Sequence, residues 1–217
     1  MKKDIEIELK FQILDEQQTM DFLEKLSFIS EKRVVDVYLD TKDASLFKKG
    51  FFVRIRDNKT LDFKYNLEDI ENKHEHCEEH SFSLPLTIDS LDSLNRVCKI
   101  LGLTEIKDPT LEELLTENNF INSMIIDKTR KTYKDEDFVF CFDDVKGMGK
   151  FIEIEAHANT GDDLEKIKNK MREEIKNLKL KLITTGYNEL YWKKHNPEIY
   201  KQGKYHLEED KHVKERD

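Results

Sequence analysis

Strict alternation of apolar and charged residues marks the start of the chain. Residues 5–11 read Ile-Glu-Ile-Glu-Leu-Lys-Phe, and this two-residue period predicts a β-strand with one apolar and one charged face. Apolar stretches of strand length recur along the chain. They cover residues 34–40, 51–56, 61–65, 77–84, 123–133, 137–145 and 151–158. The pattern therefore predicts roughly eight strands, several of them joined as hairpins.

Helical spacing appears between these strands. It predicts helices over residues 19–27, 91–101 and 162–182, and a helical turn over 45–50 that ends at a glycine. A closed antiparallel barrel leaves no unpaired strand edge. The expected fold is therefore α+β, an eight-stranded antiparallel β-barrel with helices packed outside.

The composition bears on where the charges lie. The chain has 217 residues, 37% of them hydrophobic and 38% charged, with 13 Phe and 7 Tyr. The length favours one domain, or one domain with an extension. The apolar share is low for a globular protein, but the aromatic content argues against disorder. Either the surface is very highly charged, or part of the charge lines a polar cavity.

Charge and cysteine content exclude several classes. A net charge of -9 argues against binding to a nucleic acid polymer, which needs a basic surface. Cys77, Cys98 and Cys141 are widely spaced, which argues against a disulfide framework or a zinc site. We find no signal peptide and no apolar stretch of membrane-spanning length. A cytoplasmic protein is expected, with its oligomeric state, including a homodimer, left open.

Ionisable residues two apart form rows on single strand faces. These rows are Glu6, Glu8 and Lys10; Arg54 and Arg56; Lys64 alone on its strand; Lys128 and Arg130; and Glu153 and Glu155. Any one row fits a solvent-facing strand. Together they separate into basic and acidic sets, whereas solvent faces usually mix signs. If these faces meet inside a barrel, carboxylates would hold divalent cations and arginine forks would hold phosphate.

Six blocks resemble, in the same order, motifs of the CYTH domains, the triphosphate tunnel metalloenzymes. They are residues 6–10 (Glu-Ile-Glu-Leu-Lys, like ExExK), 38–41 with 50–56, 61–64, 128–130, 143–155 and 185–190. The resemblance spans residues 3–190 and implies a tunnel domain over 1–192, followed by a polar extension over 193–217. It also implies a triphosphate-containing small molecule as ligand and Mg²⁺ or Mn²⁺ as cofactor.

The resemblance implies roles for individual residues as well. Those expected to bind the triphosphate are Arg54, Arg56, Lys64, Lys128, Arg130 and Asp143. Those expected to hold metal ions are Glu6, Glu8, Glu153 and Glu155. Lys10 would contact phosphate or orient the attacking group. Lys10 and Glu8 are the expected catalytic pair.

One segment departs from the family pattern. Residues 74–81 read His-Glu-His-Cys-Glu-Glu-His-Ser, where many relatives carry Arg-x-Glu-x-Glu. Glu78 is expected to keep one acidic position, with His76 and His80 in phase. The histidines allow a transition-metal site, but a polar loop that enters a strand is the favoured interpretation.

Three functions stay open. Attack by water would make the protein a triphosphatase acting on tripolyphosphate, a nucleoside triphosphate or thiamine triphosphate. Attack by the ribose 3′-hydroxyl of ATP would make it a class IV adenylate cyclase. A non-catalytic polyphosphate- or nucleotide-binding module is the third. Hydrolysis is favoured because the sequence shows no base-specific pocket. A further interpretation, a β-barrel that only binds proteins, predicts that the charged rows face outward.

Overall fold

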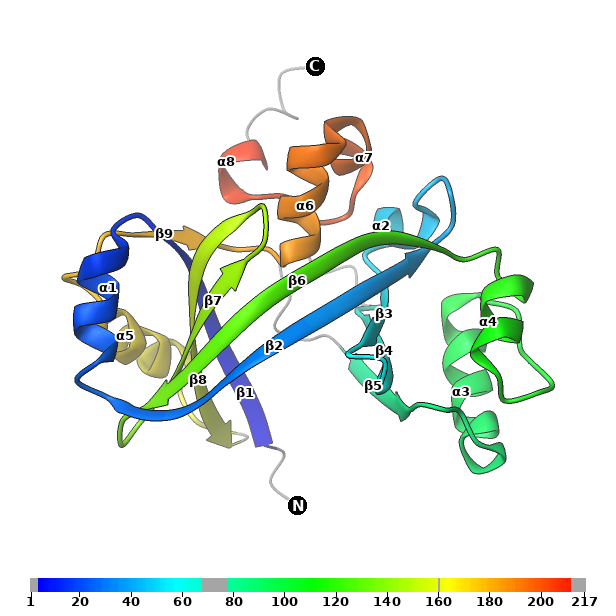
Figure 1. Ribbon diagram of the computed structural model, residues 1–217, viewed down its shortest axis with the longest axis horizontal. Helices are drawn as coiled ribbons and strands as arrows, with labels where there is room; N and C mark the ends of the chain where they lie inside the picture. The colour runs from blue at the N-terminus through cyan, green and yellow to red at the C-terminus, as the bar shows by residue number, and fades with distance from the viewer. Residues whose placement is uncertain (1–3, 68–77, 160, 212–217) are drawn as a thin grey trace. The chain divides into compact units, whose positions relative to one another are not determined.

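The computed structural model describes residues 4–67, 78–159 and 161–211. Its strands form one nine-stranded antiparallel sheet in the order β5-β4-β3-β2-β6-β7-β8-β1-β9 (Figure 1). The strands are β1 Asp4–Ile13, β2 Ser27–Asp40, β3 Phe52–Arg56, β4 Thr60–Tyr65, β5 Glu78–Ser83, β6 Ile121–Lys134, β7 Val139–Val145, β8 Gly149–Asn159 and β9 Leu180–Ile183. The α+β class is confirmed. The sheet of the described residues has nine strands rather than the expected eight, and it is not closed into a barrel, because β5 and β9 at its two ends do not pair.

The ninth strand corrects the helix predicted over residues 162–182. Helix α5 covers only Leu164–Glu174, and β9 then pairs antiparallel with β1. Residues 178–182 read Leu-Lys-Leu-Lys-Leu, which is the two-residue period of a strand. The run of Lys and Glu residues ahead of it concealed this change of period.

The other helices of the described residues are α1 Glu16–Leu23, α2 Ser45–Lys49, α3 Ile88–Leu101, α4 Leu111–Glu117, α6 Tyr187–His195, α7 Pro197–Gln202 and α8 Glu208–Lys211. The first three correspond to helical segments that the sequence predicted. Glycines in the left-handed conformation end α2 at Gly50 and α3 at Gly102, as expected. Helix α1 begins earlier than predicted because the Asp15 carboxylate accepts from the backbone N–H of Gln18. Helices α4, α6, α7 and α8 were not predicted. None of the helices among the described residues is long and apolar enough to span a membrane.

The chain divides into two compact units. The first comprises Met1–Val34 and Asp127–Thr184. Within it, α1 and α5 lie against one face of β1, β7 and β8 (Figure 1). Their buried side chains, such as Leu23 and Met171, pack with Ile152 and Ile154. Because alternate residues point to opposite faces, the other face of these strands carries the charged rows.

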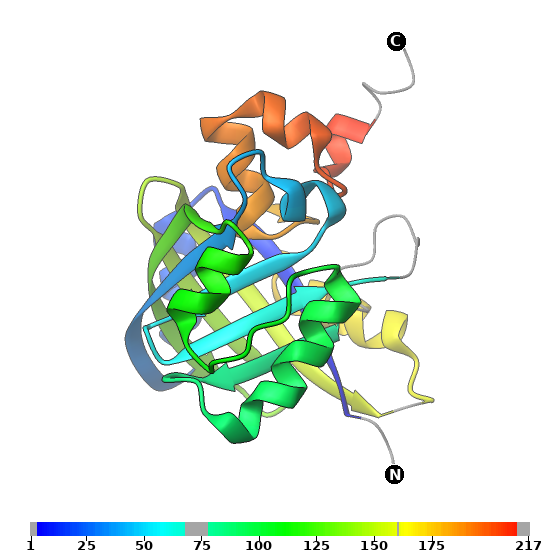
Figure 2. The same ribbon diagram turned by 90° about the vertical axis from the view of Figure 1, so that its right-hand side faces the viewer.

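The second unit comprises Val35–Ile126 and Thr185–Asp217. Helices α3 and α4 cover one face of β3, β4 and β5 (Figure 2). Leu94 and Leu114 pack there with Val53, Leu61 and Phe63. The opposite face of the same strands again carries charged side chains, so both units share one design.

Aromatic residues of the C-terminal segment pack within the second unit. The Trp192 ring lies 5.8 Å from that of Phe47 in α2, and the Tyr205 ring stacks on Phe52 of β3 with centroids 6.4 Å apart. A Cβ added at Gly50 would lie 2.7 Å from the Tyr205 ring. Position 50 therefore requires glycine for two reasons, the close contact with the Tyr205 ring and the left-handed backbone conformation.

Candidate functional site

Some of the charged residues in the rows are buried. Lys128, Asp143 and Glu153 are 6%, 0% and 4% exposed, and the Arg54 side chain is 21% exposed. Charges are buried only when they are paired or bound to a ligand. The alternative of outward-facing rows is therefore wrong for these residues, although their functional roles stay predictions.

In the first unit, Asp143 holds the two cations of β6. Its carboxylate accepts two hydrogen bonds from the Arg130 guanidinium, both at 2.6 Å, and lies 2.6 Å from the Lys128 Nζ. The register explains this, because Arg130 pairs directly with Asp143 across β6 and β7. Asp143 therefore fixes both cations in one orientation.

Glu153 is the second anchor of this cluster. Its carboxylate lies 3.1 Å from the Lys10 Nζ and also accepts from Arg130. Lys10 in turn lies 3.1 Å from Glu8. Lys10, Glu8 and Glu153 thus form a chain of ion pairs between β1 and β8.

Burial and charge act against each other on these groups. Burial raises the pKa of Glu153, but Lys10, Lys128 and Arg130 outweigh it and hold that pKa well below its usual range. Burial lowers the pKa of Lys10, yet Glu153 and Glu8 raise it above its usual value. For Lys128, burial prevails over Glu153 and Asp143 and lowers the pKa.

Glu8 and Glu155 are the carboxylates best placed for a divalent ion. They are direct partners in the register of β1 and β8, and like charges placed opposite each other destabilise a sheet unless a cation lies near them. Arg130 Nη1 lies 3.7 Å from Glu155. The described residues contain no ready cluster of three acidic, His or Cys ligands, but the oxygen donors fit Mg²⁺, which keeps several waters. The Glu6 backbone pairs with His157, and its side chain lies outside the described part of the chain.

The second unit holds a matching set of ion pairs. Arg56 donates two hydrogen bonds to Asp36, at 2.7 and 3.0 Å. Arg54 donates to Asp62 at 3.1 Å. Burial lowers the pKa of Arg54, but Tyr38, Asp36 and Asp62 raise it above its usual value, so the guanidinium stays charged.

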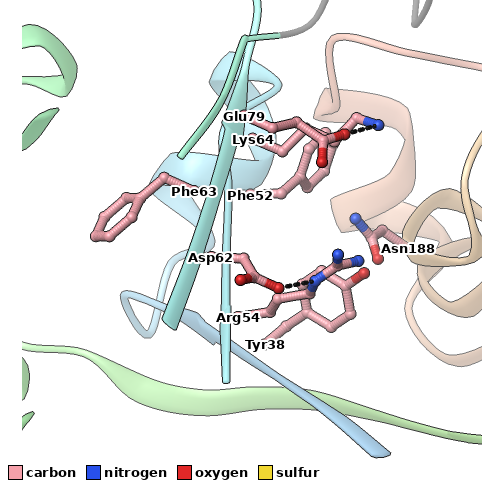
Figure 3. Close-up of a pocket in the computed structure, with 8 residues that line it drawn as sticks. All are labelled: Tyr38, Phe52, Arg54, Asp62, Phe63, Lys64, Glu79 and Asn188. Atoms are coloured by element: carbon pink, nitrogen blue, oxygen red, sulfur yellow. Dashed lines mark hydrogen bonds and ion pairs between the residues drawn. The ribbon is translucent and has the colours of Figure 1, made fainter. Parts of the chain in front are cut away.

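A small pocket opens on this face between the side chains of Tyr38, Arg54, Lys64 and Asn188 (Figure 3). Lys64 Nζ lies 2.6 Å from Glu79. The structure brings together here the predicted phosphate ligands Arg54 and Lys64, which come from β3 and β4.

The acidic residue of β5 that faces the pocket differs from the predicted one. Glu79, not Glu78, shares the pocket face with Lys64, its partner in the β4–β5 register. Glu78 and His80 lie on the other face, where both contact the Tyr65 hydroxyl, at 3.2 and 3.1 Å. His74, His76 and Cys77 lie outside the described residues. The prediction counted the strand one residue out of phase, which inverts every side chain.

Sequence reasoning missed the carboxylates Asp36, Asp62 and Glu79, the pocket residue Asn188, and Cys141, whose Sγ lies 3.6 Å from Glu155. A usable signal existed for two of them. Asp62 stands two residues before Lys64, and Asp36 stands two before Tyr38, so each shares a strand face with a pocket residue.

Comparison with known proteins gives one family. The CYTH domain model matches residues 4–187. A Methanocaldococcus jannaschii protein named as a candidate adenylate cyclase is 28% identical over 192 residues, which are 86% of this chain and 98% of that protein.

Solved structures share the fold. The PH1819 protein of Pyrococcus horikoshii OT3 has a TM-score of 0.59 at 20% identity, over 88% of this chain and 99% of that one. A Hippeastrum protein, described as a candidate adenylyl cyclase with a dominant triphosphatase activity, has a TM-score of 0.58 at 18% identity, over 89% and 98% of the two chains.

Proposed function

Because the chain belongs to the CYTH domain family, we propose that it is a metal-dependent triphosphatase that binds the phosphates of its substrate through arginine and lysine side chains. Members of this family are triphosphatases or adenylate cyclases and depend on metal ions, so the chain is an enzyme that acts on a triphosphate. We propose specifically that the reaction is hydrolysis and that the metal ion is Mg²⁺ or Mn²⁺.

The observation that carries it is that carboxylates hold the cations in fixed orientations. Arg130 is held by Asp143 and Glu153, and Arg56 is held by Asp36. Guanidinium forks match phosphate oxygens, and cations oriented in advance stabilise the charge that develops during phosphoryl transfer without reorganisation. The five proposed phosphate ligands are Arg54, Arg56, Lys64, Lys128 and Arg130.

The remaining residues have proposed roles as well. Asp143 acts on the substrate through Lys128 and Arg130, both of which it contacts directly. Glu8, Glu155, Glu153 and Glu6 are the proposed carboxylates for the metal, which would neutralise phosphate oxygens and lower the pKa of an attacking water. Lys10, between Glu8 and Glu153, holds both carboxylates in place and presents a charge beside them.

Hydrolysis is proposed over cyclisation because cyclisation must fix the sugar and base as well as the phosphates. The pocket at Arg54 encloses about 30 Å³, which holds one or two water-sized groups, so this pocket by itself gives no support for a base site. The name of the M. jannaschii relative supports adenylate cyclase as the second candidate.

The test is product analysis. The protein is incubated with Mg²⁺ or Mn²⁺ and with tripolyphosphate, ATP or thiamine triphosphate. Release of orthophosphate supports the proposal. Formation of cyclic AMP from ATP without orthophosphate would replace it by the cyclase.

A binding module without catalysis is tested by Glu153→Gln. We expect turnover to be lost while triphosphate binding persists. Unchanged turnover in this variant, against an active wild type, would show that the proposed metal ligands are wrong. Absence of turnover in the wild type, with binding retained, would support the binding module.

A further inference from the structure

Asn188 has a buried amide with an unmet acceptor. It is the second residue of α6 and is 6% exposed. Its Oδ1 is buried and accepts no hydrogen bond from any group in the described chain. Buried polar atoms almost always have partners, so an exception in a native fold points to a missing ligand or water.

This amide faces the pocket. Figure 3 shows Asn188 across from Arg54 and Tyr38, with its carboxamide directed at the space between them. The Arg54 guanidinium is anchored on its far side by Asp62. A group that enters the pocket beside Arg54 therefore also meets the Asn188 amide.

The chemistry of an amide oxygen limits what that group can be. A carboxamide oxygen accepts hydrogen bonds or binds a cation, and ionised phosphate oxygens have no hydrogen to donate. Among the groups of a triphosphate ester, the donors are therefore the O–H and N–H groups of its organic part. The pocket volume of about 30 Å³ admits a hydroxyl or amino group but not a ring.

We infer that Asn188 recognises a hydroxyl or amino group on the organic part of the substrate. The substrate is then a nucleoside triphosphate or a similar ester, and inorganic tripolyphosphate is the poorer substrate. This inference rests on the proposed triphosphatase function and names its substrate class. A site that hydrogen-bonds a substrate group discriminates strongly against analogues that lack it.

Two variants test the residue. Asn188→Leu removes the acceptor at similar volume, and Asn169→Leu, the same change at an exposed position of α5, is the control. We expect kcat/KM for ATP to fall about tenfold in Asn188→Leu while the value for tripolyphosphate stays within about twofold, and both to be unchanged in the control. Equal losses on both substrates, or no loss on either, would overturn the inference.

A second test changes the substrate and needs no variant. Wild-type rates are compared for ATP, 2′-deoxy-ATP, 3′-deoxy-ATP and purine riboside triphosphate, which lacks the 6-amino group. One analogue should react about tenfold more slowly and so identify the donor. If all four react alike, Asn188 recognises none of these groups and the inference fails.

The proposed triphosphatase function and the recognition role of Asn188 can be disproved separately. If no triphosphate is turned over, the proposed function is wrong. Calorimetric binding of a non-hydrolysable ATP analogue then tests Asn188 alone. Affinity about tenfold weaker in Asn188→Leu than in Asn169→Leu would support the recognition role, and equal affinity would overturn it.

Discussion

Glu8 and Glu155 lie directly opposite each other on the paired strands β1 and β8. Two carboxylates at such a position repel each other. Nearby Lys10 and Arg130 offset only part of this charge, because each also serves Glu153. A divalent cation bound in the first unit would therefore give the largest electrostatic stabilisation at this pair of carboxylates.

Replacing either carboxylate should weaken the response to metal. We expect millimolar Mn²⁺ to raise the melting temperature of the wild type, since a ligand that binds only the folded state stabilises it. Glu8→Gln and Glu155→Gln should reduce this rise by at least about half, while in EDTA their unfolding free energy should stay within about 1 kcal/mol of wild type. Melting curves with and without Mn²⁺ measure this. Glu198→Gln, at an exposed glutamate of α7, is the control, and an equal rise in all four proteins would contradict the assignment.

Two arginines with the same geometry should behave differently. Arg56 and Arg33 each donate two hydrogen bonds to one aspartate, Asp36 and Asp127. Lysine keeps the charge but loses the fork. Arg56→Lys should raise KM for the triphosphate about tenfold, whereas Arg33→Lys, on the surface, should leave kinetics unchanged and stability within about 0.5 kcal/mol. Steady-state kinetics decide, and equal effects would remove Arg56 from the phosphate site.

Cys98 should lower the free energy of unfolding at alkaline pH. It is fully buried in α3, and burial, aided by Glu105, raises its pKa from 9.0 to about 11. Below pH 9 the thiol is protonated in both states and has no effect. Between pH 9 and about 11 only the unfolded state loses the proton, so stability falls as pH rises. Relative to Cys98→Val, the wild type should lose about 1–2 kcal/mol over this range in urea titrations. Parallel pH profiles would show that the thiol ionises normally.

Removal of residues 196–217 should destabilise the second unit and disturb the pocket. This segment buries Tyr200, Tyr205 and Leu207, each worth about 1.5–3 kcal/mol. Phe52, which Tyr205 stacks on, also lines the pocket. We expect a loss of at least about 3 kcal/mol and a higher KM. Tyr205→Ala should reproduce part of both effects, and Lys201→Ala, at an exposed residue, neither. A truncated protein of wild-type stability would support the domain boundary predicted at residue 192.

The sequence predicted the strands and their charged faces because a two-residue period is a local signal. It predicted the family from ordered motifs. It did not predict that Asp36 and Asp62 would hold the arginines, because that depends on the register between β2, β3 and β4. It mistook Glu78 for Glu79 because phase within a polar strand has no apolar marker, as the single buried hydrophobic residue of β5, Phe82, is near its end. The β9 strand was missed because α5 and β9 follow one another in a single charged run.

The ion pairs of the second unit affect how a phosphate group can bind there. Arg54, Arg56 and Lys64 are met by Asp36, Asp62 and Glu79, so three positive groups face three negative ones. These carboxylates compete with any incoming phosphate for the same guanidinium and ammonium protons. Binding is then an exchange of one anion for another, and its strength reflects the difference between phosphate and carboxylate rather than the full attraction of either.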